Sequence, residues 1–508
     1  MPELKRQHGA KRGLQTQGTC RSTVLGRTAR NSLALFISQA ATALVTVLIL
    51  PLLTRYLGKA GYGLYTSIYA FVGTCSILGD IGLNVILNRE IAKQREHGSR
   101  LLGQTLVLKT LLVLLFLVVV MTAAIACSFG SLEWLLLSIC ALESGIRTYA
   151  NTLVTALRAY EIMGYETIIT LLDRACWVVG ILLVVWLDLG LVVVFLVFLF
   201  AAIIRLTSAF IICWIHLPRP RPSVNLRVWR FLLREAWPIG LTLGARRVYD
   251  RVGIVQLSTV SDSATVGLFS GPNRVYQLTN SLTSSVPDAL FPSMAAAARI
   301  SKNYLQWITV SGLKALLLTT LPLAGFYVMF ASYFTPWLLG GEFGEAALAL
   351  QVLAPAVVLA AVNALLRALL RASGRQRYDL LCTSGALATN FFLNLLLIPR
   401  LSYVGPAVAV LVSQGIQSGL ALAGTLPLLG RLPARHLFIP LLATLTMLGA
   451  WWLAGSLPLL LRLPMGLIVY GIALFLLGGI DHSTVQLMKT ILDKHSASGE
   501  TGARENVA

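Results

Sequence analysis

Charged side chains inside long apolar runs are the residues of this sequence whose types and spacing could do chemistry. The run 236–260 carries Arg246, Arg247, Asp250 and Arg251, and the run 264–293 carries Arg274. A charge at the centre of a membrane helix costs ~2.5 kcal/mol or more on insertion scales. Each of these residues therefore requires a partner, an interface or a function.

The spacing of these arginines indicates a cavity that binds an anion. Arg247 and Arg251 lie on one face of a helix, where like charges repel each other, so lipid would expel them. Counted from the outer ends of their runs, Arg251 and Arg274 lie at one depth, about 14–15 Å at ~1.5 Å per residue. Guanidinium groups are planar, stay charged and bind phosphate oxygens bidentately. The pattern predicts a pyrophosphate site formed by Arg247, Arg251 and Arg274.

Further charged residues in the apolar runs are secondary candidates. The predicted cavity also includes Arg246, Arg205 and Arg174. The acidic residues predicted to carry a coupling ion or to balance charge are Asp250, Asp80 and Asp288. A structural alternative is a salt-bridge network between two halves of the protein, with Asp80, Asp173 or Asp288 as the acidic partners. On the run 132–157, Glu143 and Arg147 lie one helical turn apart and are predicted to neutralise each other.

The apolar runs that hold these charges predict an all-α, polytopic membrane protein. Hydrophobic residues make up 56% of the sequence and charged residues only 12%, with a mean hydropathy of +0.76. A soluble domain carries roughly twice that share of charge. A membrane span needs ~20 apolar residues, and the sequence offers about fourteen such runs. These values exclude a soluble protein.

The distribution of basic residues predicts the orientation of the chain. The net charge is +20, and Lys and Arg gather in alternate loops such as 88–100, 218–235 and 371–377. Membrane proteins keep such loops in the cytoplasm, so both termini are predicted to lie there and the number of spans to be even. The positive charge is therefore explained by topology, and no nucleic-acid partner is expected.

Two similar segments indicate an internal repeat. Gly63-Leu64-Tyr65 aligns with Gly267-Leu268-Phe269, and each triplet follows an external turn at the start of a span. A parallel repeat of this kind is typical of transporters. The predicted organisation is a disordered basic cytoplasmic tail (1–30), an N-lobe of six spans (31–217), a cytoplasmic linker (218–235), a C-lobe of six spans (236–428), two further spans (429–481) and a cytoplasmic tail (482–508).

Two blocks of sequence resemble a known family. The segment Leu50–Ala92 resembles the opening of polysaccharide flippases of the multidrug/oligosaccharidyl-lipid/polysaccharide exporter superfamily, and Val266–Ala295 resembles their eighth helix. Asn273-Arg274 and Phe291-Pro292-Ser293-Met294 are distantly similar to the pattern of the lipid II flippase.

This resemblance implies a two-lobed core of twelve helices that moves by alternating access. The implied cargo is a polyprenyl-pyrophosphate-linked oligosaccharide used for surface polysaccharide such as O-antigen or exopolysaccharide. The implied location is the bacterial cytoplasmic membrane. A polysaccharide polymerase and a chain-length regulator are the expected protein partners of a monomeric chain.

Two other functions stay open. A cation-coupled multidrug exporter would share the architecture, but it would require an acidic cavity, which the surplus of arginine disfavours. A membrane polymerase or glycosyltransferase would require a large extramembrane loop to hold its chemistry. The seven cysteines and six histidines show no metal-ligand spacing, and no nucleotide-binding motif is present. We therefore predict neither an enzyme nor a bound cofactor or metal.

Overall fold

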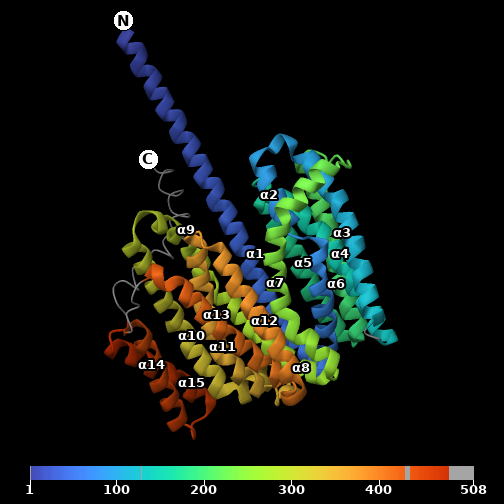
Figure 1. The fold of residues 1–508 in the computed structure, drawn as a ribbon, viewed down its shortest axis with the longest axis vertical. Helices are drawn as coiled ribbons and strands as arrows, with labels where there is room; N and C mark the ends of the chain where they lie inside the picture. Colours follow the sequence, from blue (N-terminus) through green and yellow to red (C-terminus); the bar gives the residue numbers. More distant parts are fainter. Residues whose placement is uncertain (1, 127–128, 430–434, 480–508) are drawn as a thin grey trace.

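The computed structural model describes residues 2–126, 129–429 and 435–479, and confirms the all-α prediction: the described residues contain no strand (Figure 1). The α-helices are α1 (Pro2–Cys75), α2 (Leu83–Lys93), α3 (Gly98–Ala126), α4 (Ser131–Ala159), α5 (Met163–Leu187), α6 (Gly190–His216), α7 (Leu226–Val260), α8 (Ser263–Thr283), α9 (Ser285–Ile300), α10 (Lys302–Leu339), α11 (Ala347–Ala372), α12 (Gln376–Leu401), α13 (Val404–Leu429), α14 (Arg435–Leu453) and α15 (Leu459–Leu476). Three short 3₁₀ helices connect them, at Ser76–Gly79, Arg95–His97 and Gly341–Phe343.

The helices follow the predicted spans in order. The first predicted span and the start of the second both lie in α1, and α8 with α9 covers the span 264–293. Within the described part of the chain, nine helical segments are long and apolar enough to cross a membrane. Helices α4, α7 and α8 are not among them, because the charged and polar residues that form the candidate site lower their hydropathy.

The two termini differ in how far the structure describes them. Helix α1 begins at Pro2, so residues 2–30 continue the first helix, whereas composition predicts a disordered tail. No proline interrupts the chain between Pro2 and Pro51, which leaves the helix without a strong breaker. The predicted cytoplasmic tail, 482–508, lies outside the described residues.

Gly58 separates the two spans that share α1. Its backbone angles, φ 63° and ψ −178°, fall where only glycine is free of steric strain. A Cβ atom at this position would lie 2.8 Å from Oε2 of Glu342. The same carboxylate accepts a hydrogen bond of 3.0 Å from the backbone N–H of Lys59. This turn therefore ties the first helical hairpin to the loop that follows α10.

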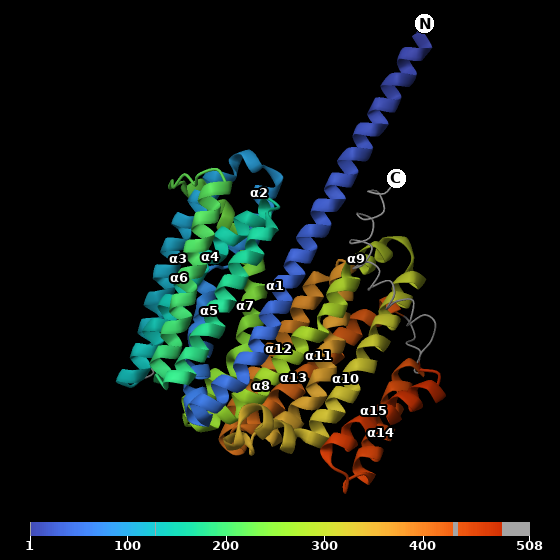
Figure 2. The same ribbon diagram turned by 180° about the vertical axis from the view of Figure 1, so that it is seen from behind.

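The helices form two groups whose packing differs at the two ends of the bundle. The end with the loops 94–97, 217–225, 301 and 373–375 is called the basic end, and the opposite end, with the turns at 58, 261–262 and 340–346, is called the far end. Helices α2 to α6 lie on one side of α1 and α7, and helices α8 to α13 lie on the other, as both views show (Figures 1 and 2). We refer to these groups as the N-lobe and the C-lobe.

At the far end, one hydrophobic core joins the lobes. It includes Tyr62 and Phe198 from the N-lobe side and Phe269 and Phe343 from the C-lobe side. At the basic end each lobe has its own core. Leu102 and Val154 belong to the core of the N-lobe, and the core of the C-lobe is formed by residues such as Leu290, Met294 and Leu365. The bundle is therefore closed at the far end, and the lobes pack separately at the basic end.

Helix α7 connects the lobes along its length. Its first turns pack on α2 and α3 of the N-lobe, where Leu232 and Ala236 are fully buried against Leu83 and Ile86. Its second half contacts the C-lobe, where Gln256 Nε2 donates a hydrogen bond of 3.3 Å to a carbonyl oxygen of α12. Helices α14 and α15 pack outside α10, so the two trailing spans predicted from the sequence lie beside the two-lobed bundle (Figure 2).

The two segments of the predicted repeat contact each other where α1 crosses α8. A Cβ atom on Gly63 would lie 1.7 Å from the carbonyl oxygen of Ser263, and one on Gly267 would lie 1.9 Å from that of Lys59. Each glycine therefore contacts the residue that lies four positions before the other glycine in the sequence. Thr66 Oγ1 donates a hydrogen bond of 2.9 Å to Ser270 Oγ, 204 residues away. The aligned segments form a quasi-symmetric crossing that only residues without a Cβ allow.

We expect a leucine at this crossing to open the far end. The Gly63→Leu variant places a side chain where backbone atoms lie, and overpacking costs ~1–3 kcal/mol or more. Thermal unfolding of the purified protein should begin at a clearly lower temperature than in the wild type. Gly415→Leu is the matched control, because no atom lies within 4 Å of a Cβ built there. Equal melting temperatures of the two variants would contradict this account of the crossing.

Candidate anion site between the lobes

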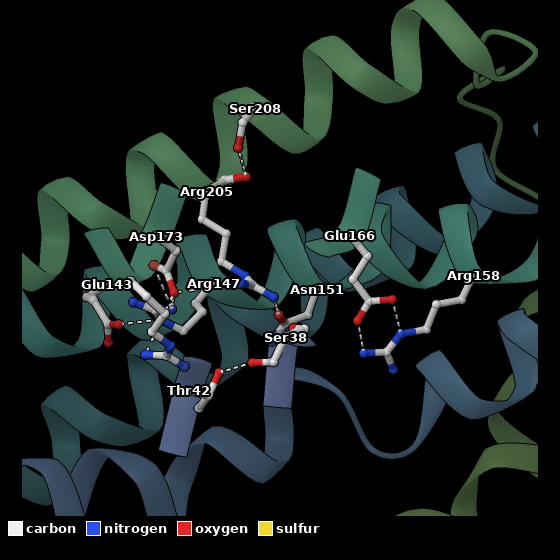
Figure 3. A network of polar contacts seen from close by, with 11 residues as sticks. Ser38, Thr42, Glu143, Arg147, Asn151, Arg158, Glu166, Asp173, Arg205 and Ser208 are labelled. Atoms are coloured by element: carbon white, nitrogen blue, oxygen red, sulfur yellow. Dashed lines mark hydrogen bonds and ion pairs between the residues drawn. The ribbon is translucent and has the colours of Figure 1, made fainter. Parts of the chain in front are cut away.

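A cluster of arginines surrounds one buried aspartate in the N-lobe (Figure 3). Asp173, on α5, is fully buried. Its carboxylate lies 3.3 Å from Nη1 of Arg147 on α4, 3.6 Å from Nη1 of Arg205 on α6, and 3.8 Å from Nη1 of Arg174. Arg147 Nε also forms an ion pair of 2.5 Å with Glu143, as predicted from their spacing. Three helices of the N-lobe therefore meet at one ion cluster.

The N-lobe cluster retains surplus positive charge. Three guanidinium groups face two carboxylates. Three of their nitrogen atoms, Arg147 Nη2, Arg174 Nε and Arg205 Nε, are buried without a hydrogen-bond partner among the described residues. The guanidinium carbon of Arg174 lies 4.4 Å from the ring centre of Trp177, which holds the cation in place. Unpartnered N–H groups beside excess positive charge fit an anion.

The three arginines predicted to bind pyrophosphate lie on α7 and α8. Arg247 and Arg274 are exposed, and Arg251 packs against the second span of α1. A Cβ atom on Gly73 would lie 1.5 Å from Nη1 of Arg251, so only glycine leaves room for this side chain. Within the described residues none of the three arginines forms an ion pair, and Nη1 of Arg251 has no partner. Arg274 Nη1 donates one long hydrogen bond, 3.4 Å, to Gln277.

The two sets of arginines lie close enough to interact electrostatically. Arg251 interacts electrostatically with Arg247 and Arg274, and Arg274 also interacts with Arg174 of the N-lobe cluster. We call Arg174, Arg247, Arg251 and Arg274 the guanidinium band. The structure thus brings together all three primary candidates and one secondary candidate, while Arg205 lies at the back of the band beside Asp173.

Arg246, Asp250 and Asp288 lie elsewhere. They line a cavity of about 340 Å³ inside the C-lobe, between α7, α8, α9, α11, α12 and α13. Arg246 and Asp250, one helical turn apart, form no ion pair within the described part of the chain. The two groups still attract each other electrostatically, and both side chains are exposed on the cavity wall.

Asp80 is paired, but not across the lobes. Its Oδ1 lies 2.6 Å from Nζ of Lys109, which is fully buried and also donates to Asn84 Oδ1 at 2.8 Å and to Thr152 Oγ1 at 2.7 Å. A lysine near the end of a membrane span can extend its side chain toward the surface. Lys109 does not, because polar partners inside the N-lobe satisfy all of its N–H groups. The predicted network between the lobes is wrong for Asp80 and Asp173, whose ion pairs lie within the N-lobe.

Removing Lys109 should therefore destabilise the N-lobe. Lys109→Ala leaves Asp80 without its counter-charge, and breaking a buried ion pair costs ~3–5 kcal/mol. We expect this variant to accumulate poorly in the membrane and to unfold at a lower temperature. The double variant Lys109→Met with Asp80→Asn removes both charges and should recover most of the loss. A double variant as unstable as Lys109→Ala would contradict the pairing.

Some residues of the site could not be identified from the sequence. Gly73 and Trp177 carry no charge, and only the tertiary structure places them against Arg251 and Arg174. The sequence predicts that Glu143 alone neutralises Arg147, but in the structure Arg147 also contacts Asp173. In the described residues, no group of three His, Cys, Asp or Glu side chains could hold a metal ion.

Comparison with known proteins places this architecture in a family. A family model described as "Polysaccharide biosynthesis protein" matches residues 28–298. The chain is 22% identical over 395 residues to the probable low-salt glycan biosynthesis flippase Agl15 of Haloferax volcanii, covering 77% of this chain and 82% of that protein.

Solved structures share the fold. The lipid II flippase MurJ in an inward closed conformation aligns with a TM-score of 0.73 and 15% identity, over 87% of this chain and 97% of that chain. An inward-facing transporter of the multidrug resistance MATE family, from the MOP superfamily, aligns with a TM-score of 0.58 and 15% identity, over 79% and 98%. The family match covers more than half of the sequence and agrees with the resemblance found in its two blocks. This chain is a member of the polysaccharide biosynthesis protein family.

Proposed function

We propose that this protein is a flippase that moves a polyprenyl-pyrophosphate-linked oligosaccharide across the cytoplasmic membrane by alternating access during surface polysaccharide biosynthesis. The observation that carries this proposal is the guanidinium band. Arg247, Arg251 and Arg274 have no ion pair among the described residues, and they lie beside the surplus charge of Arg174. A pyrophosphate supplies the negative charge and the acceptor oxygens that these groups lack.

The packing of the lobes supports alternating access. One core closes the far end, while the cores at the basic end are separate. A small rotation of the lobes about the region of α7 would exchange these two arrangements, as expected for transporters built from repeats. The state described here is then the one that receives cargo from the basic end.

The names of the relatives agree with this cargo. Agl15 is named a probable glycan biosynthesis flippase, and MurJ is named a lipid II flippase. Because one relative is named a flippase and the other a probable flippase, we propose a transporter and not a polysaccharide polymerase or a glycosyltransferase. The alternative of a multidrug exporter is supported by the likeness to the MATE fold. It is disfavoured by the guanidinium band, because a cluster of arginines without matching carboxylates repels organic cations.

The location and orientation follow from the charge distribution. We propose that the basic end faces the cytoplasm, so that both termini lie on that side of a bacterial cytoplasmic membrane. Asp250 and Asp288 stay candidates for coupling or charge balance. Asp80 is a weaker candidate, because Lys109 already neutralises it. A polymerase and a chain-length regulator remain the proposed protein partners of a monomeric flippase.

Deleting the gene for this chain tests the proposed function. We expect one surface polysaccharide to disappear and its lipid-linked oligosaccharide precursor to accumulate in the membrane. Extraction of membrane lipids and mass spectrometry of the pyrophosphate-linked fraction measure this directly. Unchanged surface polysaccharide, together with accumulation of organic cations inside the cells, would support the multidrug exporter instead.

A further inference from the structure

The cavity inside the C-lobe has chemistry unlike that of the guanidinium band. We call it the C-lobe cavity. None of Arg247, Arg251 and Arg274 lines it. Its volume of about 340 Å³ lies at the lower end of the range for ligand pockets, ~300–1,000 Å³. It is therefore large enough for a small polar group, and it adjoins the guanidinium band at Gln277, which lines the cavity and accepts a hydrogen bond from Arg274.

Amide and hydroxyl groups held in a fixed network form the wall of the C-lobe cavity. Asn363 Nδ2 donates hydrogen bonds to Gln414, at 2.7 Å to Oε1 and at 3.1 Å to the backbone oxygen. Gln414 Nε2 in turn donates to the hydroxyl groups of Tyr249, at 3.1 Å, and Tyr276, at 3.2 Å. The hydroxyl of Tyr249 lies 2.9 Å from Ser413 Oγ. These bonds fix the orientation of Asn363 before any ligand arrives.

Two buried acceptors in this wall, Oδ1 of Asn280 and Oδ1 of Asn363, are left unsatisfied by the described residues. Asn363 is only 2% exposed, and its Oδ1 is buried without a hydrogen-bond partner in the described part of the chain. A buried acceptor without a partner costs ~1–3 kcal/mol. Because both hydrogens of Nδ2 point to Gln414, Oδ1 is available to a ligand that donates a hydrogen bond.

The charges around the C-lobe cavity nearly balance, unlike those of the guanidinium band. Asp250 and Asp288 are exposed on its wall, and ionised carboxylates only accept hydrogen bonds and repel phosphate oxygens. Arg367, on the same wall, forms an ion pair of 2.5 Å with Asp379. Arg371, also exposed on this wall, lies 4.0 Å from the same carboxylate, and Arg246 is a second exposed cation. The exposed charges of the wall, two carboxylates and two guanidinium groups, are therefore balanced. A neutral ligand that carries many hydroxyl groups matches this wall.

We propose that the C-lobe cavity binds sugar rings of the cargo, so that Asn363 and the neighbouring carboxylates recognise hydroxyl or amide groups of the glycan while the pyrophosphate lies at the guanidinium band. This inference rests on the proposed function. It assigns selectivity for the glycan to the C-lobe and binding of the lipid pyrophosphate to the band between the lobes.

Binding of two lipid probes to the purified, detergent-solubilised full chain tests this proposal. One probe is undecaprenyl diphosphate without sugar, and the other is the lipid-linked oligosaccharide fraction from cells that lack this chain. We expect Asn363→Leu and Ser281→Trp each to weaken binding of the oligosaccharide probe about tenfold, because a site built for polar groups loses its bonds or its space. Binding of undecaprenyl diphosphate should not change.

A matched substitution controls for the added bulk. Ser281 is exposed and lines the C-lobe cavity, whereas Ser285 is also exposed but does not line it. Ser285→Trp should leave both probes unaffected. Because Ser281→Trp leaves the buried network intact, it stays informative if Asn363→Leu fails to fold. Full binding of the oligosaccharide probe by Ser281→Trp, or equal losses for both probes, would overturn the inference. A wild-type chain that binds neither probe would instead overturn the proposed function itself.

Discussion

Cells whose only copy of this chain carries Arg247→Ala, Arg251→Ala and Arg274→Ala should export no more glycan than cells without the chain. Each hydrogen bond to a charged group contributes ~1.5–3 kcal/mol, so the loss of three guanidinium groups removes most of the affinity for pyrophosphate. The amount of protein in the membrane should stay normal, because none of the three arginines stabilises a described carboxylate through an ion pair. Surface glycan staining and immunoblotting measure the two quantities.

A matched control removes the same charge elsewhere. Arg227, Arg299 and Arg377 are exposed near three separate loops of the basic end. Replacing all three with alanine removes only one basic residue from each loop, so we expect this variant to keep its topology and its export. The single variant Arg251→Lys gives a finer test. It keeps the charge but loses the planar, bidentate group, and we expect about a tenfold loss of transport. Full export by the triple alanine variant would rule out the guanidinium band as the binding site.

A disulfide across the crossing of α1 and α8 should stop transport reversibly. The Oγ atoms of Thr66 and Ser270 lie 2.9 Å apart, so Thr66→Cys and Ser270→Cys bring two sulfur atoms within reach of each other. Oxidation would lock the far end, and cargo could enter from the basic end but not leave. Transport should fall to the background level on oxidation and return on reduction.

The two single cysteine variants are the controls for this experiment, since neither can form the bond. Both should transport equally well under oxidising and reducing conditions. If the oxidised double variant forms the disulfide and still transports at the normal rate, the lobes do not separate at the far end. Alternating access through this crossing would then be wrong.

The sequence allows the architecture to be predicted far more completely than the site. Long apolar runs predict helices because a membrane leaves the backbone few other ways to satisfy its hydrogen bonds. The Gly63 and Gly267 triplets predict the repeat, because close approach of two helices restricts these positions to glycine. The apolar runs and the repeated triplets are both visible along the sequence and can therefore be identified without the structure.

The partners of the charges depend on tertiary contacts and could be predicted only in part. The pair Glu143 and Arg147 follows from helical spacing, and the structure confirms it. The pair Lys109 and Asp80 joins two helices and has no signature in the sequence. The depth argument for Arg251 and Arg274 stays a prediction, and the electrostatic interaction between the two side chains is consistent with it. The sequence could not reveal that Arg246 and Asp250 line the cavity inside the C-lobe.

Reconstitution of the purified chain into vesicles tests the central claim most directly. The vesicles contain lipid-linked oligosaccharide from cells that lack the chain, and a glycan-specific reagent outside measures the fraction that becomes accessible. The account predicts that the wild-type chain exposes oligosaccharide from the inner leaflet, and that the variant with Arg247, Arg251 and Arg274 replaced by alanine does not. Equal exposure by wild type, triple variant and protein-free vesicles would contradict the claim that this protein moves such a lipid.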